Sequence, residues 1–294
     1  MAQTKYEYAG DYVDTQGIIL MGTGGLDKVD NKDISSMVIE LNIYESIYNQ
    51  ALTGTVVITD AIDLISTLPL TGNERLAFKF HTPRGQIDAS SETGHPFHIF
   101  KLTDRQQISE GIQSYVLHFC SREMLRNMRT RVSSAKNGTL DQIASLIFQE
   151  PEGLDSKKRL TVEPTRNSDK YTFPNMHPLD AITMLSKKAL STNGQGAGYY
   201  FYETTQGYYF RSYENMVAIS GKLARPPKEV YDYKVRNTKV GESSSDTIAV
   251  RRNMLEDIRA VESYQFINNY DTAFHQLTGT YGSNTITYDF YTKS

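Results

Sequence analysis

The stretch that most constrains the fold is a helix followed by a tight hairpin, over residues 173–211. Pro178 fits the first turn of a helix, where its missing N–H removes no intrahelical hydrogen bond. Apolar residues then recur at spacings of three and four and form one stripe: Leu179, Ile182, Leu185 and Ala189. Thr205-Gln206-Gly207 predicts the turn between two strands rich in aromatic residues. The stretch therefore predicts a compact α+β unit that separates a mainly β front from a mixed rear.

Charge and composition exclude several classes of protein. The 294 residues include 31 basic and 34 acidic ones, so the net charge of −3 provides no global attraction to nucleic acid or anionic membranes. No apolar run approaches the about 18 residues that a membrane span needs, and the N-terminus lacks the pattern of a signal peptide. Cys120 is the only cysteine, so no intrachain disulfide can form. These features predict a protein without a membrane anchor that folds in a cytoplasm.

The front of the chain has the pattern of an arm followed by a β domain. Residues 1–33 contain scattered glycines and predict a flexible N-terminal arm. Short strands with turn signals between them predict a first β-barrel domain over 34–120: 37–43, 55–59, 76–80, 96–102 and 114–120, with a short helix over 60–68. In the first strand, alternation predicts Ile39 on the same buried face as Leu41 and Ile43.

The pattern changes after Cys120. Ser121 predicts a helix through Arg131, and Thr139 with Gln142 predicts a second helix that begins with a capping box. Residues 153–172 are polar and are expected to form a loop, so 121–212 is predicted as an α+β helix/hairpin domain. Residues 213–294 are predicted as a second β-barrel-like domain, with strands over 229–238 and 285–292 and a short helix over 271–277. The predicted fold class is α+β, mainly antiparallel β, with two β-barrel-like domains and an intervening α+β unit.

No group of residues amounts to an active site. The glycines of 22–25 match neither nucleotide-binding fingerprint. His95 and His98 are three positions apart, an odd spacing that on a strand points them to opposite faces, and no further metal ligands lie nearby. His118 and Cys120 share a strand face, but Cys120 is better interpreted as a small core residue.

Carboxylates also offer candidate acid and base pairs, and nothing in the sequence prefers one. The pairs considered are Glu40 with Glu45 and Asp60 with Asp63. The sequence thus predicts no catalytic residue, no metal site and no cofactor, and a protein that is not an enzyme.

One local concentration of basic residues follows Cys120. Its members are Arg122, Arg126, Arg129, Arg131 and Lys136, and a smaller group lies at 157–159. On a helix, Arg122, Arg126 and Arg129 would share one face. This face could contact nucleic acid, contact an acidic partner protein or simply be solvated, and we favour the interpretation of a solvated face. The tyrosine-rich hairpin could stack on bases or sugars, although such hairpins more often pack in cores and interfaces.

The order of elements resembles a family of phage tail proteins. The segment Met37-Val-Ile-Glu-Leu-Asn-Ile-Tyr-Glu-Ser-Ile-Tyr-Asn-Gln-Ala-Leu-Thr-Gly-Thr-Val-Val-Ile-Thr-Asp60 and the segment Leu70-Thr-Gly-Asn-Glu-Arg-Leu-Ala-Phe-Lys-Phe80 look like its first barrel strands. The helices and hairpin over 140–213 look like its intervening part, and 271–293 is similar to a piece of its second barrel. The family is the baseplate hub subunit of contractile-tail bacteriophages, which is related to the N-terminal hub region of type VI secretion VgrG spike proteins.

The resemblance implies a structural role in assembly. It implies a homotrimer whose ring adapts the hexameric tail tube to the trimeric central spike. The implied partners are the tail tube proteins, the central spike protein and other baseplate (wedge) proteins, with DNA only in transit through the lumen. The implied location is the tail baseplate of a virion that is assembled in the host cytoplasm. The alternatives are a hub or spike component of a type VI or extracellular contractile injection system, and a tail-associated glycan-binding or glycan-degrading protein.

Overall fold

The computed structural model divides the chain into two compact units, Met1–Pro227 and Lys228–Ser294. It describes residues 13–14, 17–22, 31–67, 72–82, 85–90, 95–192, 198–217 and 230–233, and further along 260–261, 263–265, 272–273 and 291.

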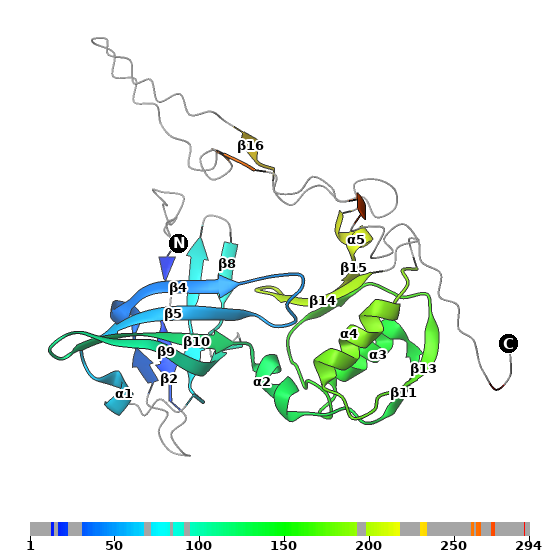
Figure 1. Cartoon of the computed structure of the whole chain (residues 1–294), viewed down its shortest axis with the longest axis horizontal. Helices are drawn as coiled ribbons and strands as arrows, with labels where there is room; N and C mark the ends of the chain where they lie inside the picture. The colour runs from blue at the N-terminus through cyan, green and yellow to red at the C-terminus, as the bar shows by residue number, and fades with distance from the viewer. Residues whose placement is uncertain are drawn as a thin grey trace, which may run out of the picture. The chain divides into compact units, whose positions relative to one another are not determined.

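A seven-stranded antiparallel sheet, which we call the front sheet, forms the N-terminal part of the first unit (Figure 1). Its strands follow the order β3 (Asn31–Asp33), β2 (Ile19–Met21), β6 (Arg75–Ala77), β9 (Phe97–Ser109), β10 (Ile112–Cys120), β5 (Thr53–Asp60) and β4 (Val38–Tyr44). A smaller sheet contains β1 (Val13–Asp14), β7 (Lys79–Thr82) and β8 (Gly85–Asp88). The short helices η1 (Ser35–Met37) and α1 (Leu64–Thr67) flank these strands.

The core of this sheet lies on one face, as strand alternation predicts. Tyr115, Leu117 and Phe119 of β10 are fully buried, and every second residue of β5 is buried as well. Phe119 lies in an aromatic cluster with Phe78 and Phe97, at ring centroid distances of 6.2 and 4.9 Å. The mainly antiparallel β prediction is confirmed, while closure into a barrel is not found among the described residues, whose sheet ends in β3 and β4.

The register of β4 differs from the predicted alternation because the strand contains a bulge. The pairing with β5 shifts between Val38 and Glu40, which turns Val38 toward the core. Leu41 and Ile43 also pack against the core, as predicted. Ile39 instead lies on the outside with an exposed fraction of 66%. The prediction that Ile39 is buried is wrong.

Part of the expected N-terminal arm belongs to the sheet. β2 pairs with β6, and Leu20 is fully buried in the core cluster. The expected strand over 76–80 breaks at the buried Phe78, so that β6 and β7 join different sheets. The expected helix over 60–68 is shortened to α1, because residues up to Asp60 remain in β5.

A second core is built around the predicted helix and hairpin. Figure 1 shows α3 (Leu140–Gln149) and α4 (Pro178–Lys188) packed together beside β14 (Tyr199–Thr204) and β15 (Gly207–Ser212). Pro178 occupies the start of α4, and the predicted stripe is buried. The Gln142 side chain accepts a hydrogen bond from the Thr139 N–H at 3.4 Å, as expected of a capping box.

Three further strands and two helices complete this part of the first unit. They are β11 (Ala135–Thr139), β12 (Leu160–Val162), β13 (Ser168–Thr172), α2 (Arg122–Arg129) and α5 (Tyr213–Val217). β12 and β13 lie in the polar stretch that was expected to be a loop, because β12 pairs in parallel with β15 and β13 pairs with β11. Helices and strands thus both occur in this region, and the loop prediction for 153–172 is wrong.

The second unit is described at few positions. β16 (Asp232–Tyr233) pairs in parallel with β17 (Ala260–Val261), and the rings of Tyr233 and Tyr264 meet edge to face at 5.4 Å. The predicted strand over 285–292 lies outside the described residues except at Tyr291, and so does most of the helix predicted over 271–277.

The close approach of two strands at Gly54 gives a prediction about stability. A Cβ atom added at Gly54 would lie 2.2 Å from Cζ of Phe119 and 2.3 Å from the backbone oxygen of Asn42. Gly54→Ala is therefore expected to lower the free energy of unfolding by about 1–3 kcal/mol through overpacking. Urea unfolding measures this loss.

Thr59→Ala provides the control on the same strand, because Thr59 lies on its outward, half-buried face. That variant is expected to change stability by about 1 kcal/mol or less. Equal losses in the two variants would contradict the account of the Gly54 contact.

Candidate functional site

A buried cation between two buried carboxylates lies where the front sheet meets the second core. Lys158 Nζ is 2.9 Å from Glu123 Oε2 and 2.6 Å from Glu203 Oε1. The Lys158 side chain is 10% exposed, and those of Glu123 and Glu203 are 2% and 1% exposed. Glu123 lies in the first turn of α2, Lys158 in the segment before β12, and Glu203 in β14. We call them the Lys158 network.

The remaining oxygens of the Lys158 network also have partners. Glu203 Oε2 accepts hydrogen bonds from the Leu52 N–H at 2.7 Å and from the Tyr208 hydroxyl at 3.0 Å. Glu123 Oε1 accepts one from the Ser156 hydroxyl at 2.6 Å. Because Leu52 directly precedes β5, the network ties the front sheet to the second core.

Burial and pairing act in opposite directions on these charges. Burial by itself raises the pKa of Glu123, but the charge of Lys158 and the hydrogen bonds outweigh it and hold that pKa below its usual value. Burial lowers the pKa of Lys158, and the charges of Glu203 and Glu123 outweigh it and raise that pKa. Glu123 and Lys158 are therefore both charged at neutral pH.

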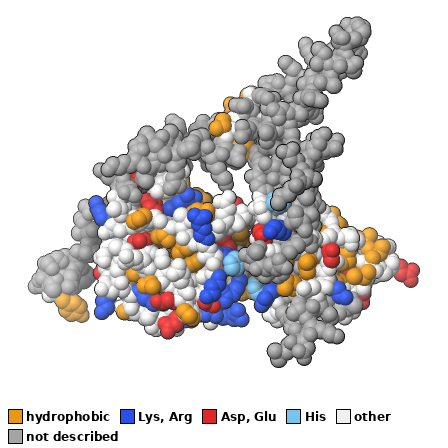
Figure 2. All heavy atoms as spheres, turned by 180° about the vertical axis from the view of Figure 1, so that it is seen from behind, with side chains coloured by type: hydrophobic (Ala, Val, Ile, Leu, Met, Phe, Trp, Pro, Cys, Tyr) orange, Lys and Arg blue, Asp and Glu red, His pale blue; other side chains and the backbone are white. Residues whose placement is uncertain are grey.

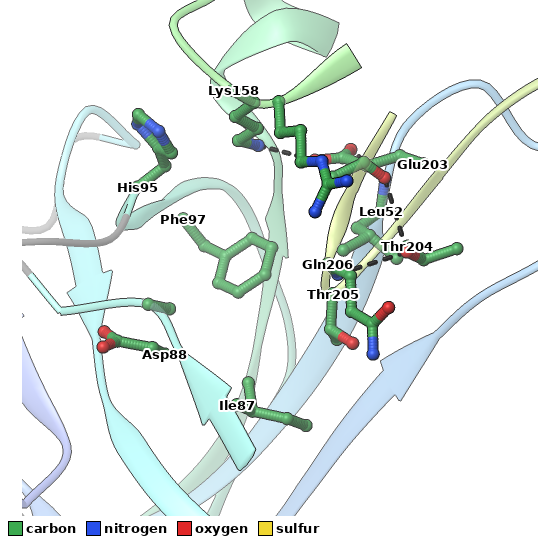
Figure 3. Close-up of a pocket in the computed structure, with 13 residues that line it drawn as sticks. Leu52, Ile87, Asp88, His95, Phe97, Lys158, Glu203, Thr204, Thr205 and Gln206 are labelled. Atoms are coloured by element: carbon green, nitrogen blue, oxygen red, sulfur yellow. Dashed lines mark hydrogen bonds and ion pairs between the residues drawn. The ribbon is translucent and has the colours of Figure 1, made fainter. Parts of the chain in front are cut away.

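A pocket of 220 Å³ opens beside the network (Figure 3). Figure 3 shows Lys158 and Glu203 linked on one side, with His95 and Phe97 facing them and Gln206 at the hairpin turn. The pocket thus lies between β9 and the β14–β15 turn.

A second pocket, of 370 Å³, is lined by basic residues, of which the sequence analysis had identified some but not all. Its lining includes Arg75, His95, His98, Arg122, Arg129 and Lys157, together with Pro96, Glu123 and Leu125. On the face seen in Figure 2, Lys and Arg side chains gather around histidine side chains near the middle of the view. We call this hollow the basic pocket.

The arginines that follow Cys120 do not form one free face. Arg122 donates to the backbone oxygen of Asp155 at 2.7 Å and to its carboxylate at 3.0 Å. Arg126 donates to the carbonyl oxygens of Pro151 and Gly153, and Arg131 donates to that of Asn175 at 3.2 Å. Several of these cations therefore hold α2 against neighbouring loops.

The two histidines expected on opposite faces of a strand both line the basic pocket. β9 begins at Phe97, so His95 precedes the strand and does not follow its alternation. Burial first, and then the charges of Arg75 and Arg122, lower the pKa of His98 to about 4. Among the described residues, no group of His, Cys, Asp and Glu could hold a metal ion.

The other residues that the sequence offered as catalytic candidates are buried or hydrogen-bonded within the fold. His118 Nε2 lies 2.8 Å from the Thr103 hydroxyl, while burial raises the pKa of Cys120 to about 12, which disfavours a reactive thiolate. Asp60 accepts hydrogen bonds from the backbone of Leu64 at 2.8 Å and from the Tyr115 hydroxyl at 3.2 Å. Glu45 accepts one from the Thr205 N–H at 2.6 Å.

Most of the aromatic hairpin packs inside the protein. Tyr199, Phe201, Tyr208 and Phe210 belong to the second core, as the interpretation of a core hairpin requires. Tyr200 alone among its neighbours reaches outward, where its ring lies 5.9 Å from that of Tyr48. Together they line a groove of 310 Å³ that also includes Thr183 and Lys187.

The free edge of the front sheet is the remaining surface feature. β4 is the last strand of its sheet, with β5 as its one partner strand among the described residues. Ile39 and Tyr44 on β4 are 66% and 49% exposed, and Tyr48 just beyond it is 76% exposed. Open edges with exposed apolar side chains favour pairing with another chain. We call β4 with Tyr48 the edge surface.

Comparison with known proteins finds similarity in structure and not in sequence. No family model matches the chain, and no curated protein matches it. The tail protein from Neisseria meningitidis MC58 shares 12% identity over 76% of this chain and 56% of its own, with a TM-score of 0.43. The prophage tail protein gp18 from Listeria monocytogenes EGD-e shares 12% identity over the same shares of each chain, with a TM-score of 0.44.

A component of the type VI secretion system from E. coli is also similar. It shares 12% identity over 67% of this chain and 46% of its own, with a TM-score of 0.35. Two of these similar structures are thus phage tail proteins, and the third is a component of a type VI secretion system. The chain spans little more than half the length of the tail proteins it matches. None of the helices in the described part of the chain has the length and apolar character that a membrane crossing requires.

The Lys158 network gives a prediction about stability. Lys158→Met leaves two buried carboxylates without their cation, and is expected to lower the free energy of unfolding by about 3–5 kcal/mol at neutral pH. Lys157→Met is the control, because Lys157 is the exposed neighbour. Denaturant unfolding of the two variants measures the difference.

The same network predicts a pH dependence. The lowered pKa of Glu123 contributes stability above its usual value of 4.5, and this contribution is lost as the pH falls through the folded-state pKa. Without Lys158 the orphaned carboxyls take up protons readily, so the loss caused by Lys158→Met is expected to shrink as the pH falls toward 4.5. A loss that is independent of pH would contradict the assignment of charges.

Proposed function

We propose that the chain is a structural hub subunit of a contractile phage tail. In this proposal three copies form a ring that adapts the hexameric tail tube to the trimeric central spike. Each copy supplies two barrel-like parts, so that three copies present six of them to the tube. The observation that carries the proposal is the edge surface, because an edge strand with exposed apolar residues is suited to assembly and gives no chemistry for turnover.

A closed ring needs two different patches on each copy, one for each neighbour. The seven-stranded sheet has two different edges, β4 at one end and β3 at the other. β4 has seven residues and β3 has three, so β4 is the longer edge on which a neighbour can add a strand. Strand addition of this kind supplies main-chain hydrogen bonds without requiring a ligand or cofactor.

The setting of the assembly is a separate part of the proposal. A hub or spike component of a type VI or extracellular contractile injection system would use the same edge surface. The partners in either setting are the tube and spike proteins and, for the phage tail, the other baseplate proteins. Mixing the purified chain with tube and spike proteins of each system distinguishes the settings.

A glycan-binding protein is the candidate from a different class. The groove beside Tyr48 and Tyr200 favours it, because Tyr48 is exposed, Tyr200 is half-buried, and accessible tyrosine rings can stack on sugars. This function requires sugar binding by a single copy, which a ring subunit does not need. Calorimetry with cell-surface glycans tests it, and saturable binding by the monomer would favour this candidate.

The edge surface predicts the effect of a charge on assembly. Ile39→Lys would place an unpaired charge in the contact, at a cost of about 2 kcal/mol or more, and is expected to weaken self-association at least about tenfold. Light scattering over a concentration series measures the mass, which is expected to rise from the 33.3 kDa of one copy toward that of three for the natural chain.

Ile62→Lys is the matched control. Ile62 is 61% exposed, close to the 66% of Ile39, and lies outside the edge strand. This variant is expected to assemble like the natural chain. Equal assembly of both variants, or a mass of one copy for the natural chain at every concentration and with its tube and spike proteins added, would contradict the proposal.

A further inference from the structure

The basic pocket is built by segments that are distant in the sequence. Arg75 of β6 and His98 of β9 are directly paired across the sheet, and His98 is paired on its other side with Cys120 of β10. α2 begins two residues after Cys120 and supplies Arg122 and Arg129. Since adjacent strands and a helix fix these positions, the pocket is a feature of the fold and not of a flexible loop.

The positive charge of the basic pocket is neutralised only in part within the described part of the chain, where Arg122 is paired with Asp155. Glu123 is the one acidic residue in the lining, and its carboxylate is bound to Lys158. Arg75, Arg129 and Lys157 have no ion pair among the described residues. Uncompensated cations that converge on one hollow are suited to hold an anion.

The pocket continues along α2. Arg129 also lines an adjoining hollow of 600 Å³, together with Arg126 and Arg131. The two hollows share this arginine, and their size exceeds what one small oxyanion fills. An extended ligand with several negative groups fits them better than a single ion does.

The histidines show the effect of this positive field. Burial is the main cause that lowers the pKa of His98 to about 4, and the charges of Arg75, Arg122 and Arg129 add to it while Glu123 opposes it. Burial also lowers the pKa of His95, with Lys158 and Arg122 acting in the same direction and Glu123 and Glu203 against it. An anion in the pocket would raise the pKa of His98, which makes this ring a reporter of binding.

We propose that the basic pocket is a docking site for the carboxylate side chains of an acidic segment of a partner protein. Guanidinium groups bind carboxylates through paired hydrogen bonds, and the lining supplies them from β6 and α2. Nucleic acid is the less suitable ligand, because the chain has a net charge of −3 and a pI of 6.1 and so lacks the broad positive field that binds a polynucleotide. This site lies apart from the edge surface and does not depend on ring closure.

The test uses histidine resonances of the full chain in NMR. The probe is a short oligo-glutamate peptide at low ionic strength, and oligo-glutamine is the uncharged control peptide. Binding of oligo-glutamate is expected to shift the imidazole resonances of His98 and raise its pKa by about one unit or more. Oligo-glutamine is expected to leave both unchanged.

Two double variants separate this site from general charge effects. Arg75→Gln with Arg129→Gln is expected to raise the Kd for oligo-glutamate about tenfold or more, as the loss of charge-assisted hydrogen bonds requires. Lys101→Gln with Arg105→Gln removes the same charge from the exposed part of β9 and is expected to change the Kd less than about twofold. Because Arg75 and Arg129 have no ion-pair partner among the described residues, the first variant is expected to keep or raise the Tm.

Three results would overturn the proposal. They are unchanged His98 resonances with oligo-glutamate, equal losses of affinity in the two double variants, and tighter binding of double-stranded DNA or inorganic phosphate than of oligo-glutamate. Ile39→Lys is expected to leave this binding unchanged, so failure of the docking site and failure of the ring proposal are distinguishable.

Discussion

The fold of the first unit depends on one buried cation. Lys158 lies between Glu123 and Glu203, and the desolvation of three charged groups is offset only while all of their hydrogen bonds are made. Glu203 also binds the backbone of Leu52, and Glu123 binds Ser156, so a shift of either core breaks several bonds at once. The network thus disfavours other arrangements of the front sheet and the second core, which apolar packing alone would discriminate less strongly.

The two candidate interaction sites follow from this arrangement. α2 carries Glu123 in its first turn, so the network that fixes α2 also places Arg122 and Arg129 beside Arg75 and His98. The edge surface is set by a different constraint, the bulge in β4 that turns Ile39 outward. One site is a charged hollow and the other is the edge of a sheet, which suits a subunit that contacts more than one kind of neighbour.

Sequence reasoning succeeded where the signal was local. Each correct prediction depended on residues close together in the sequence. Examples are the apolar stripe of α4, the start of that helix at Pro178, and the buried face of β10 that Tyr115 and Phe119 share. The strands β12 and β13 were missed because their residues are polar and they are stabilised by pairing with partners elsewhere in the chain. The Lys158 network and the basic pocket join residues that are distant in the sequence, and no local pattern marks Arg75 as a neighbour of His98. His95 shows that the spacing rule for a strand fails for a residue that lies before the start of the strand.

The central claim is that β4 is the contact between copies, and hydrogen exchange as a function of protein concentration tests it most directly. The account predicts that amides of β4 gain protection as the copies associate, while those of β15, which is already paired on both sides, do not change. Association of the chain without any gain of protection in β4 would contradict the account.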